Sequence, residues 1–203
     1  MLLTAGMTII VFNSCGKNDD PKKEEISLTT DAGVMINGVK WATRNVDRPG
    51  TFTAKPEDPG MLYQWNSKVG WEYNKPLTPA TWDDNWNGNN ATAWEKINDP
   101  CPPGWRMPSQ GELNSLISFG SVWKAVDDRN GRQFGSGSNT LFLPAAGLLS
   151  VDGTPNSLGS YGYYWSSTLH DRISSYRLNF GNVRTVLDYR ILGAGFSCRC
   201  VAE

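Results

Sequence analysis

Apolar residues alternate with polar ones over short runs in the second half of the chain, which is the pattern of half-buried β-strands. Near its beginning, Asn37 and Gly38 separate two further β-prone runs. Because both residues tolerate positive φ, this pair predicts a hairpin over 34–41. The later strands are expected over 140–143, 147–151, 161–166, 175–180, 185–189 and 196–201.

One helix has a complete sequence signature. Ser109 and Glu112 form a capping box, in which each side chain accepts a hydrogen bond from the other residue's backbone amide. The spacing of Leu113, Leu116 and Ile117 then gives one apolar stripe, and Gly120 ends the helix. The pattern predicts a helix over 109–119, and a second, short helix is expected over about 91–97.

Two segments are predicted to be irregular. Residues 47–90 contain five Pro and four Trp interleaved with Gly, which indicates a long loop region anchored by aromatic rings. Residues 120–139 contain few apolar runs and are also predicted to be loop. One clear helix among many short strands indicates an α+β fold, in a single domain over 27–203.

The first residues predict an export signal. Residues 1–12 are apolar and uncharged, and at about 1.5 Å per residue they reach only about 18 Å, too short for a bilayer core of about 30 Å. A signal peptide over 1–15 fits that length. Ser14 directly before Cys15 resembles the bacterial lipobox, which implies that Cys15 is lipidated. The alternative is a cleaved secretory peptide in which Cys15 has no role.

The charged run after Cys15 has no apolar residue to bury, so 16–26 is predicted to be a flexible tether. Its acidic residues resemble the surface-export signal of Bacteroidetes lipoproteins. That resemblance implies an outer-membrane, cell-surface location in which the membrane is contacted through the lipid anchor only.

Composition narrows the functional classes. The 203 residues carry 19 Lys and Arg against 20 Asp and Glu, and this balance argues against a nucleic-acid partner, which would require a basic field. The chain has a single His, so it can supply at most one imidazole ligand to a metal centre. The nine Trp are expected mostly to anchor the core.

Several motifs, in order along 34–201, resemble the Fibrobacter succinogenes major paralogous domain family. That resemblance implies a C-type lectin-like fold, with small twisted antiparallel sheets, one or two helices and long loops, in an exported protein that is often a lipoprotein. The motifs are WATRN at 41–45, DPCPPGWRMP at 99–108, LPAAG at 143–147, YWSST at 164–168 and GFSCRCV at 195–201.

The family resemblance also implies a disulfide between Cys101 and Cys200. Residues 198 and 200 face the same side of a strand, so Cys198 is an alternative partner for Cys101. The fold is shared with formylglycine-generating oxidases, and an oxidase would require Cys198 and Cys200 as a free reactive pair. His170 is the only imidazole and no nucleophile motif accompanies it, so no catalytic residue is predicted.

Calcium is the remaining cofactor to consider, because many sugar-binding lectins use it. No Glu-Pro-Asn loop is present, and Trp86-Asn87-Gly88 matches a Trp-Asn-Asp strand only loosely. The pairs Asp83-Asp84 and Asp127-Asp128 are more typical of solvated loops. The sequence therefore predicts no metal ligands and no cofactor.

The segment 169–192 is the candidate binding face. Tyr176, Leu178 and Phe180 alternate and are expected to face the core, so the residues between them point outward. The alternative is an ordinary pair of edge strands with solvent-facing charges. In some lipoproteins that resemble this chain the segment is diversified by a retroelement. The candidates are the residue types that most often anchor recognition surfaces: His170, Arg172, Arg177, Asn179, Arg184, Asp188, Tyr189 and Arg190.

The sequence thus favours a non-catalytic surface lipoprotein that binds an unidentified glycan or protein ligand. The alternatives are an oxidase-type enzyme on the same fold and a structural subunit of a pilus or of the envelope.

Overall fold

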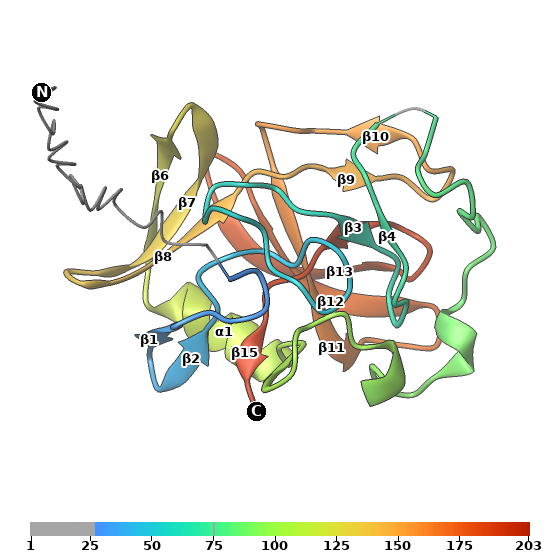
Figure 1. The fold of residues 1–203 in the computed structure, drawn as a ribbon, viewed down its shortest axis with the longest axis horizontal. Helices are drawn as coiled ribbons and strands as arrows, with labels where there is room; N and C mark the ends of the chain where they lie inside the picture. Colours follow the sequence, from blue (N-terminus) through green and yellow to red (C-terminus); the bar gives the residue numbers. More distant parts are fainter. Residues whose placement is uncertain (1–26, 75) are drawn as a thin grey trace, which may run out of the picture.

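The computed structural model describes residues 27–74 and 76–203. The predicted signal peptide over 1–15, including Cys15, and the tether over 16–26 lie outside the described residues. The described residues form small, mostly antiparallel sheets and a single α-helix, as expected for an α+β fold (Figure 1). In the part of the chain that is described, no helix is long and apolar enough to cross a membrane.

The helical elements are α1 (Gln110–Ser118) and two 3-10 turns, η1 (Gly88–Asn90) and η2 (Lys96–Asn98). The strands are β1 (Val34–Ile36), β2 (Val39–Trp41), β3 (Leu62–Tyr63), β4 (Gly70–Trp71), β5 (Trp105–Arg106), β6 (Ser121–Val126), β7 (Arg129–Ser136), β8 (Asn139–Pro144), β9 (Leu148–Leu149), β10 (Pro155–Asn156), β11 (Gly162–Leu169), β12 (Ser174–Phe180), β13 (Thr185–Ile191), β14 (Phe196–Ser197) and β15 (Val201–Ala202).

The largest sheet has six strands in the order β13-β12-β11-β14-β3-β4. Strand β12 pairs antiparallel with both β11 and β13, whereas β11 and β14 run parallel. Strand β13 lies at one edge of this sheet. The three long strands β11, β12 and β13 therefore form a platform that a candidate site can use.

Three smaller sheets complete the fold. Strands β1, β2, β15 and β5 form one sheet, and β6, β7 and β8 form a second. The pair β9 and β10 forms the third, and it lies at the opposite end of the molecule from β6–β8 (Figure 1). Helix α1 packs against β11, β12 and β13, so one face of the platform is covered by a helix.

Local signals in the sequence predicted two of these elements correctly. Asn37 and Gly38 have φ values of 48° and 80° in the turn between β1 and β2, which confirms the hairpin. At α1, Ser109 and Glu112 form the capping box in both directions. Gly120, with a φ of 87°, follows the end of the helix, as expected for a left-handed stop.

The loop predicted over 120–139 is wrong, because β6 and β7 form a long hairpin there. Asp127 and Asp128 both have positive φ at its turn, so two Asp residues adopt a conformation more typical of Asn-Gly. No helix forms over 91–97; η1 and η2 flank most of that segment instead. Residues 47–90 are largely irregular as predicted, with only the short strands β3 and β4 and the turn η1 within them.

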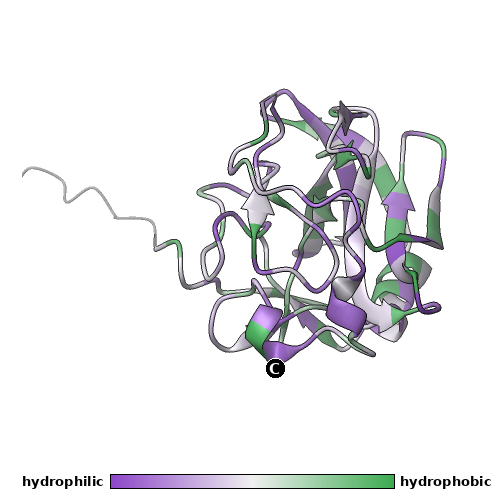
Figure 2. Ribbon diagram, turned by 90° about the vertical axis from the view of Figure 1, so that its right-hand side faces the viewer, coloured by the Kyte–Doolittle hydropathy of each residue, from purple (hydrophilic) through white to green (hydrophobic). Residues whose placement is uncertain are grey.

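The six-stranded sheet has a core on each face. Tyr164, Leu178 and Phe180 pack on one side with residues of α1 and of the β6–β8 sheet. Trp165 and Phe196 pack on the other side, under the long loops. Hydrophobic and hydrophilic residues are consequently intermixed along the same elements (Figure 2). Most of the Trp are core anchors as predicted, since six of them are buried: Trp41, Trp65, Trp71, Trp94, Trp105 and Trp165.

A disulfide joins Cys101 to Cys200, with their Cα atoms 6.0 Å apart. The pairing that the family resemblance implied is therefore formed, and the alternative with Cys198 is not. The strand predicted over 196–201 is divided, because β14 ends at Ser197 and β15 begins at Val201. Cys198 lies between them as a buried free thiol.

Candidate binding face on strands β11 to β13

The register of the three strands decides which side chains share a surface. Trp165, Arg177 and Asp188 form one row across β11, β12 and β13, because residues opposite each other in antiparallel strands point to the same face. The neighbouring row consists of Tyr163, Asn179 and Val186, and the third row consists of Leu169, Ser175 and Arg190. We call this surface, together with Tyr161 and Arg184 at its end, the β11–β13 face.

Arg177 was expected to point outward into solvent, but it is only 8% exposed. Its guanidinium lies 4.7 Å from the ring centre of Tyr163 and 4.8 Å from that of Phe196. The expectation failed because this face of the sheet also carries a core, so the residues alternating with Leu178 and Phe180 are packed as well. Leu178 and Phe180 are buried on the opposite face, as predicted.

Asp188 fixes the position of the Arg177 guanidinium. One of its carboxylate oxygens accepts from Arg177 Nε at 2.7 Å, and the other accepts from Arg177 Nη2 at 3.3 Å and from Asn179 Nδ2 at 3.1 Å. This is a two-point contact between a planar guanidinium and a carboxylate, the geometry that fixes orientation best. Arg177, Asn179 and Asp188 thus form a neutral, rigid floor rather than three independent contacts.

Aromatic rings extend this floor along the face. Tyr161 stacks on Tyr163 with ring centres 6.1 Å apart, and Tyr163 stacks on Phe196 at 5.4 Å. Phe196 is buried, Tyr163 is half-buried and Tyr161 is exposed. The series therefore runs from the core to the surface and ends on one exposed ring, that of Tyr161.

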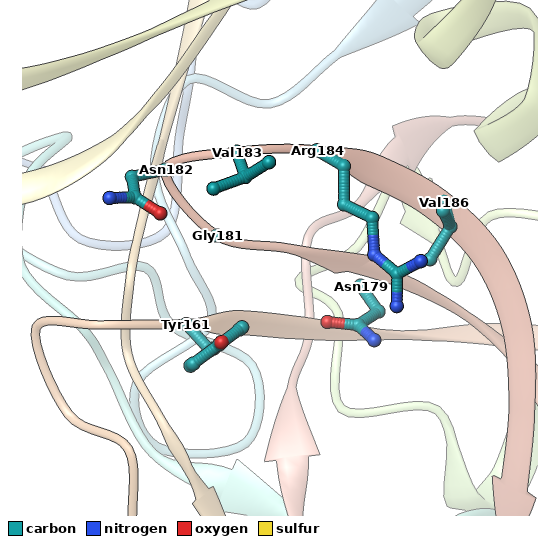
Figure 3. A pocket seen from close by; sticks show the side chains of 7 residues that line it. All are labelled: Tyr161, Asn179, Gly181, Asn182, Val183, Arg184 and Val186. Carbon is teal, nitrogen blue, oxygen red and sulfur yellow. The ribbon is translucent and has the colours of Figure 1, made fainter.

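A pocket of about 130 Å³ lies at the end of the face where β12 turns into β13. Figure 3 shows the side chains of Asn179, Arg184 and Val186 along the hairpin, with the ring of Tyr161 on the neighbouring segment. Val183 stands at the tip of the turn and is 86% exposed. The pocket offers a ring, an amide and a guanidinium.

Arg132 of β7 fixes the tip of this turn. Its buried guanidinium donates to the carbonyl oxygens of Gly181 at 2.9 Å and of Asn182 at 3.2 Å. It also donates to Ser121 Oγ at 3.0 Å, so the turn is attached to the β6–β7 hairpin. The pocket wall is thereby held by a residue outside the candidate segment.

A larger pocket, of about 510 Å³, lies at the other end of the strands. It is formed between the loop after η1 and the turn from β11 to β12. Leu169 and Ala91 both pack against the core group that contains Phe196, so this pocket lies on the same side of the sheet as Tyr163. Its lining residues are Asn90, Ala91, Thr92, Leu169, Asp171 and Arg172.

His170 and Tyr189 belong to the opposite surface. The imidazole stacks on the Tyr189 ring with centres 3.8 Å apart and meets the edge of Tyr176 at 5.1 Å. Tyr176 and Tyr189 are opposite each other in the register and share the face that carries Leu178. The structure therefore separates these two candidates from Asn179, Arg184 and Arg190.

Of the eight candidate residues, the structure brings five into the three rows and the small pocket: Arg177, Asn179, Arg184, Asp188 and Arg190. Arg172 lines the large pocket. Sequence reasoning did not identify Tyr161, Tyr163, Asn90 or Thr92. Alternation of Tyr161 and Tyr163 was a signal for the first two, whereas nothing in the sequence linked the loop at 90–92 to the turn at 171–172.

The cysteines do not form a free reactive pair. Cys200 is bound to Cys101, and burial, with a further contribution from Asp99, raises the pKa of the Cys198 thiol well above its usual value. A protonated, buried thiol is a poor nucleophile. The pair that the oxidase alternative requires is therefore not present. Over residues 27–74 and 76–203, no three His, Cys, Asp or Glu side chains gather as metal ligands.

Comparison of the chain with protein-family models, with curated proteins and with solved structures found no match. The functional assignment consequently depends on the geometry of the face and on the motifs in the sequence.

Proposed function

We propose that this chain is a non-catalytic ligand-binding protein whose contact surface is the β11–β13 face. The observation that carries this proposal lies at one end of that face. There an exposed ring, an amide and a guanidinium that has no side-chain partner among the described residues lie on a rigid floor. Arg and Tyr are enriched at the energetic centres of recognition surfaces. A rigid floor lowers the entropy lost on binding, because its side chains are already ordered.

The motifs of the sequence support a more specific proposal. The domain would have a C-type lectin-like fold of the Fibrobacter succinogenes major paralogous domain family, exported as a lipoprotein and held at the cell surface through Cys15. The α+β architecture of small sheets with one helix agrees with that fold class. The ligand would be a glycan or a protein, with no nucleic acid involved.

A screen of the full chain on a glycan array, combined with a pull-down from surface extracts, tests the proposal. Each ligand found is then measured against the double variant Tyr161→Ala, Arg184→Gln. We expect this variant to bind at least tenfold more weakly, because it removes the open ring and the free guanidinium. Arg48→Gln serves as the control, because Arg48 is exposed and its side chain has no hydrogen bond or ion pair with a described residue. Ligands that bind the double variant and the wild type equally would contradict the proposal.

A further inference from the structure

Three exposed arginines on this part of the molecule have no side-chain hydrogen bond or ion pair with any described residue: Arg172, Arg184 and Arg190. Segment 169–192 contains four Arg against two Asp, although the whole chain is nearly neutral. One Arg is neutralised already, since Arg177 is paired with Asp188. The unpaired guanidinium groups therefore give the face a local positive charge.

The two pockets repeat the same combination of groups at opposite ends of the face. The small pocket offers Arg184 with the Asn179 amide and the Tyr161 ring. The large pocket offers Arg172 with the Thr92 hydroxyl and the apolar Leu169. Each therefore has a cation, a neutral hydrogen-bonding group and an apolar wall. Strand β12 separates them, and its seven residues at about 3.3 Å each span roughly 23 Å.

We infer that the β11–β13 face binds an acidic glycan, whose sugar carboxylates pair with Arg184 and Arg172 and whose rings lie on Tyr161 and Leu169. This inference rests on the proposed function and names its ligand class. A guanidinium fork matches a planar carboxylate with two hydrogen bonds. Amide and hydroxyl side chains both donate and accept, as sugar hydroxyls require. The distance between the pockets calls for an oligosaccharide rather than a single sugar.

An acidic peptide fits this arrangement less well. An extended peptide binds a sheet through backbone hydrogen bonds at a free edge, and the edge strands of this sheet are β13 and β4. The two pockets instead present side chains, from the β12–β13 hairpin in one and from the loop at 90–92 and the turn at 171–172 in the other. Their groups are side chains placed to contact rings and hydroxyls.

The two pockets are not equal. Asp171 also lines the large pocket. The neighbouring Ser174, followed by the Ile173 amide that donates to Asp171 Oδ1 at 2.9 Å, lowers the pKa of its carboxyl. Its negative charge partly offsets Arg172. No carboxylate lines the small pocket, so Arg184 contributes more to binding than Arg172.

The test measures binding of the full chain to polygalacturonate, alginate and hyaluronan, each compared with its carboxyl-reduced form. We expect at least one acidic polymer to bind at least tenfold more tightly than its reduced form. Arg184→Gln should weaken that binding about tenfold, Arg172→Gln should weaken it less, and Arg48→Gln should leave it unchanged. Raising the salt concentration from 20 to 200 mM should weaken the binding of the wild-type chain to the acidic polymer, since the arginine charges are exposed.

The inference is overturned if none of the three polymers binds, if the reduced forms bind equally well, or if poly-glutamate binds as tightly as the best polymer. Such a result leaves the proposed function standing if the array or the pull-down yields another ligand that Tyr161→Ala, Arg184→Gln fails to bind. If no ligand depends on these two residues, both proposals fail.

Discussion

Single residues far from the candidate face show how strongly this fold depends on buried polar contacts. The Asp31 side chain is 1% exposed and pairs with Arg44 at 3.1 Å. Its carboxylate also accepts from the amides of Gly33 at 2.8 Å and Thr43 at 3.0 Å. Burial alone would raise the pKa of Asp31, but these hydrogen bonds outweigh it and the pKa is lowered.

Asp31→Asn should therefore destabilise the protein by about 3 kcal/mol at pH 7, because it leaves the Arg44 charge buried without its partner. The unfolded chain takes up a proton at Asp31 at a higher pH than the folded protein does. The stabilisation is thus complete above the ordinary pKa of 3.8 and is lost as pH falls through the lowered value. Urea unfolding of the wild type and of Asp31→Asn, at pH 7 and near pH 3, measures this contribution to the free energy of unfolding.

The difference between wild type and Asp31→Asn should shrink at the lower pH. Asp84→Asn, on an exposed loop, is the matched control and should change stability little at either pH. A difference of the same size at both pH values would show that the charge of Asp31 is not what stabilises the fold.

At the scale of elements, the candidate face is fixed by a strand outside it. Arg132 of β7 holds the carbonyl groups of Gly181 and Asn182, and so positions the turn that carries Val183 and Arg184. Arg132→Met removes the donors and leaves the buried Gly181 carbonyl oxygen without its partner, at a cost of about 2 kcal/mol.

Hydrogen exchange measures the local effect of this substitution. Amides over 181–184 should exchange faster in Arg132→Met, whereas α1 should be protected as in the wild type. The control is Arg129→Met, since Arg129 is an exposed residue of the same strand whose side chain has no hydrogen bond or ion pair within the described part of the chain. Unchanged exchange over 181–184 would contradict a positioning role for Arg132.

Elements that are specified by residues close together in the sequence were predictable, and elements that depend on contacts between distant residues were not. The capping box of α1 and the Asn37-Gly38 turn both depend on residues adjacent in sequence. The β6–β7 hairpin was missed because Asp127 and Asp128 reach positive φ without a glycine to indicate it. Its pairing is established by contacts along the two strands, which single-strand patterns do not contain.

At the scale of the whole molecule, the core on both faces of the six-stranded sheet decides which candidates are available to a ligand. Alternation correctly predicted that Leu178 and Phe180 face inward, but it treated the other side as solvent. Trp165 and Phe196 fill that side, and Arg177 packs over Phe196. The sequence therefore indicated the right segment, while the division of its residues between two surfaces required the fold.

The disulfide connects the middle of the chain to its last strands and should stabilise the whole domain. Its two cysteines are 99 residues apart, and the chain-entropy account gives up to about 4–5 kcal/mol for a loop of that length. Denaturant unfolding of the Cys101→Ala, Cys200→Ala double variant should show a loss of this order. Cys198→Ala keeps the bond and should lose much less. Equal losses in the two proteins would contradict this role for the disulfide.

The most direct test of the account is a hydrogen-exchange footprint of a ligand recovered in the screen, bound to the full chain. If the β11–β13 face is the contact surface, protection should concentrate in 161–163 and 177–190, and it should disappear in Tyr161→Ala, Arg184→Gln. Protection confined to another surface, such as the β1–β2 hairpin or the exposed side of α1, would show that the β11–β13 face is not the contact surface.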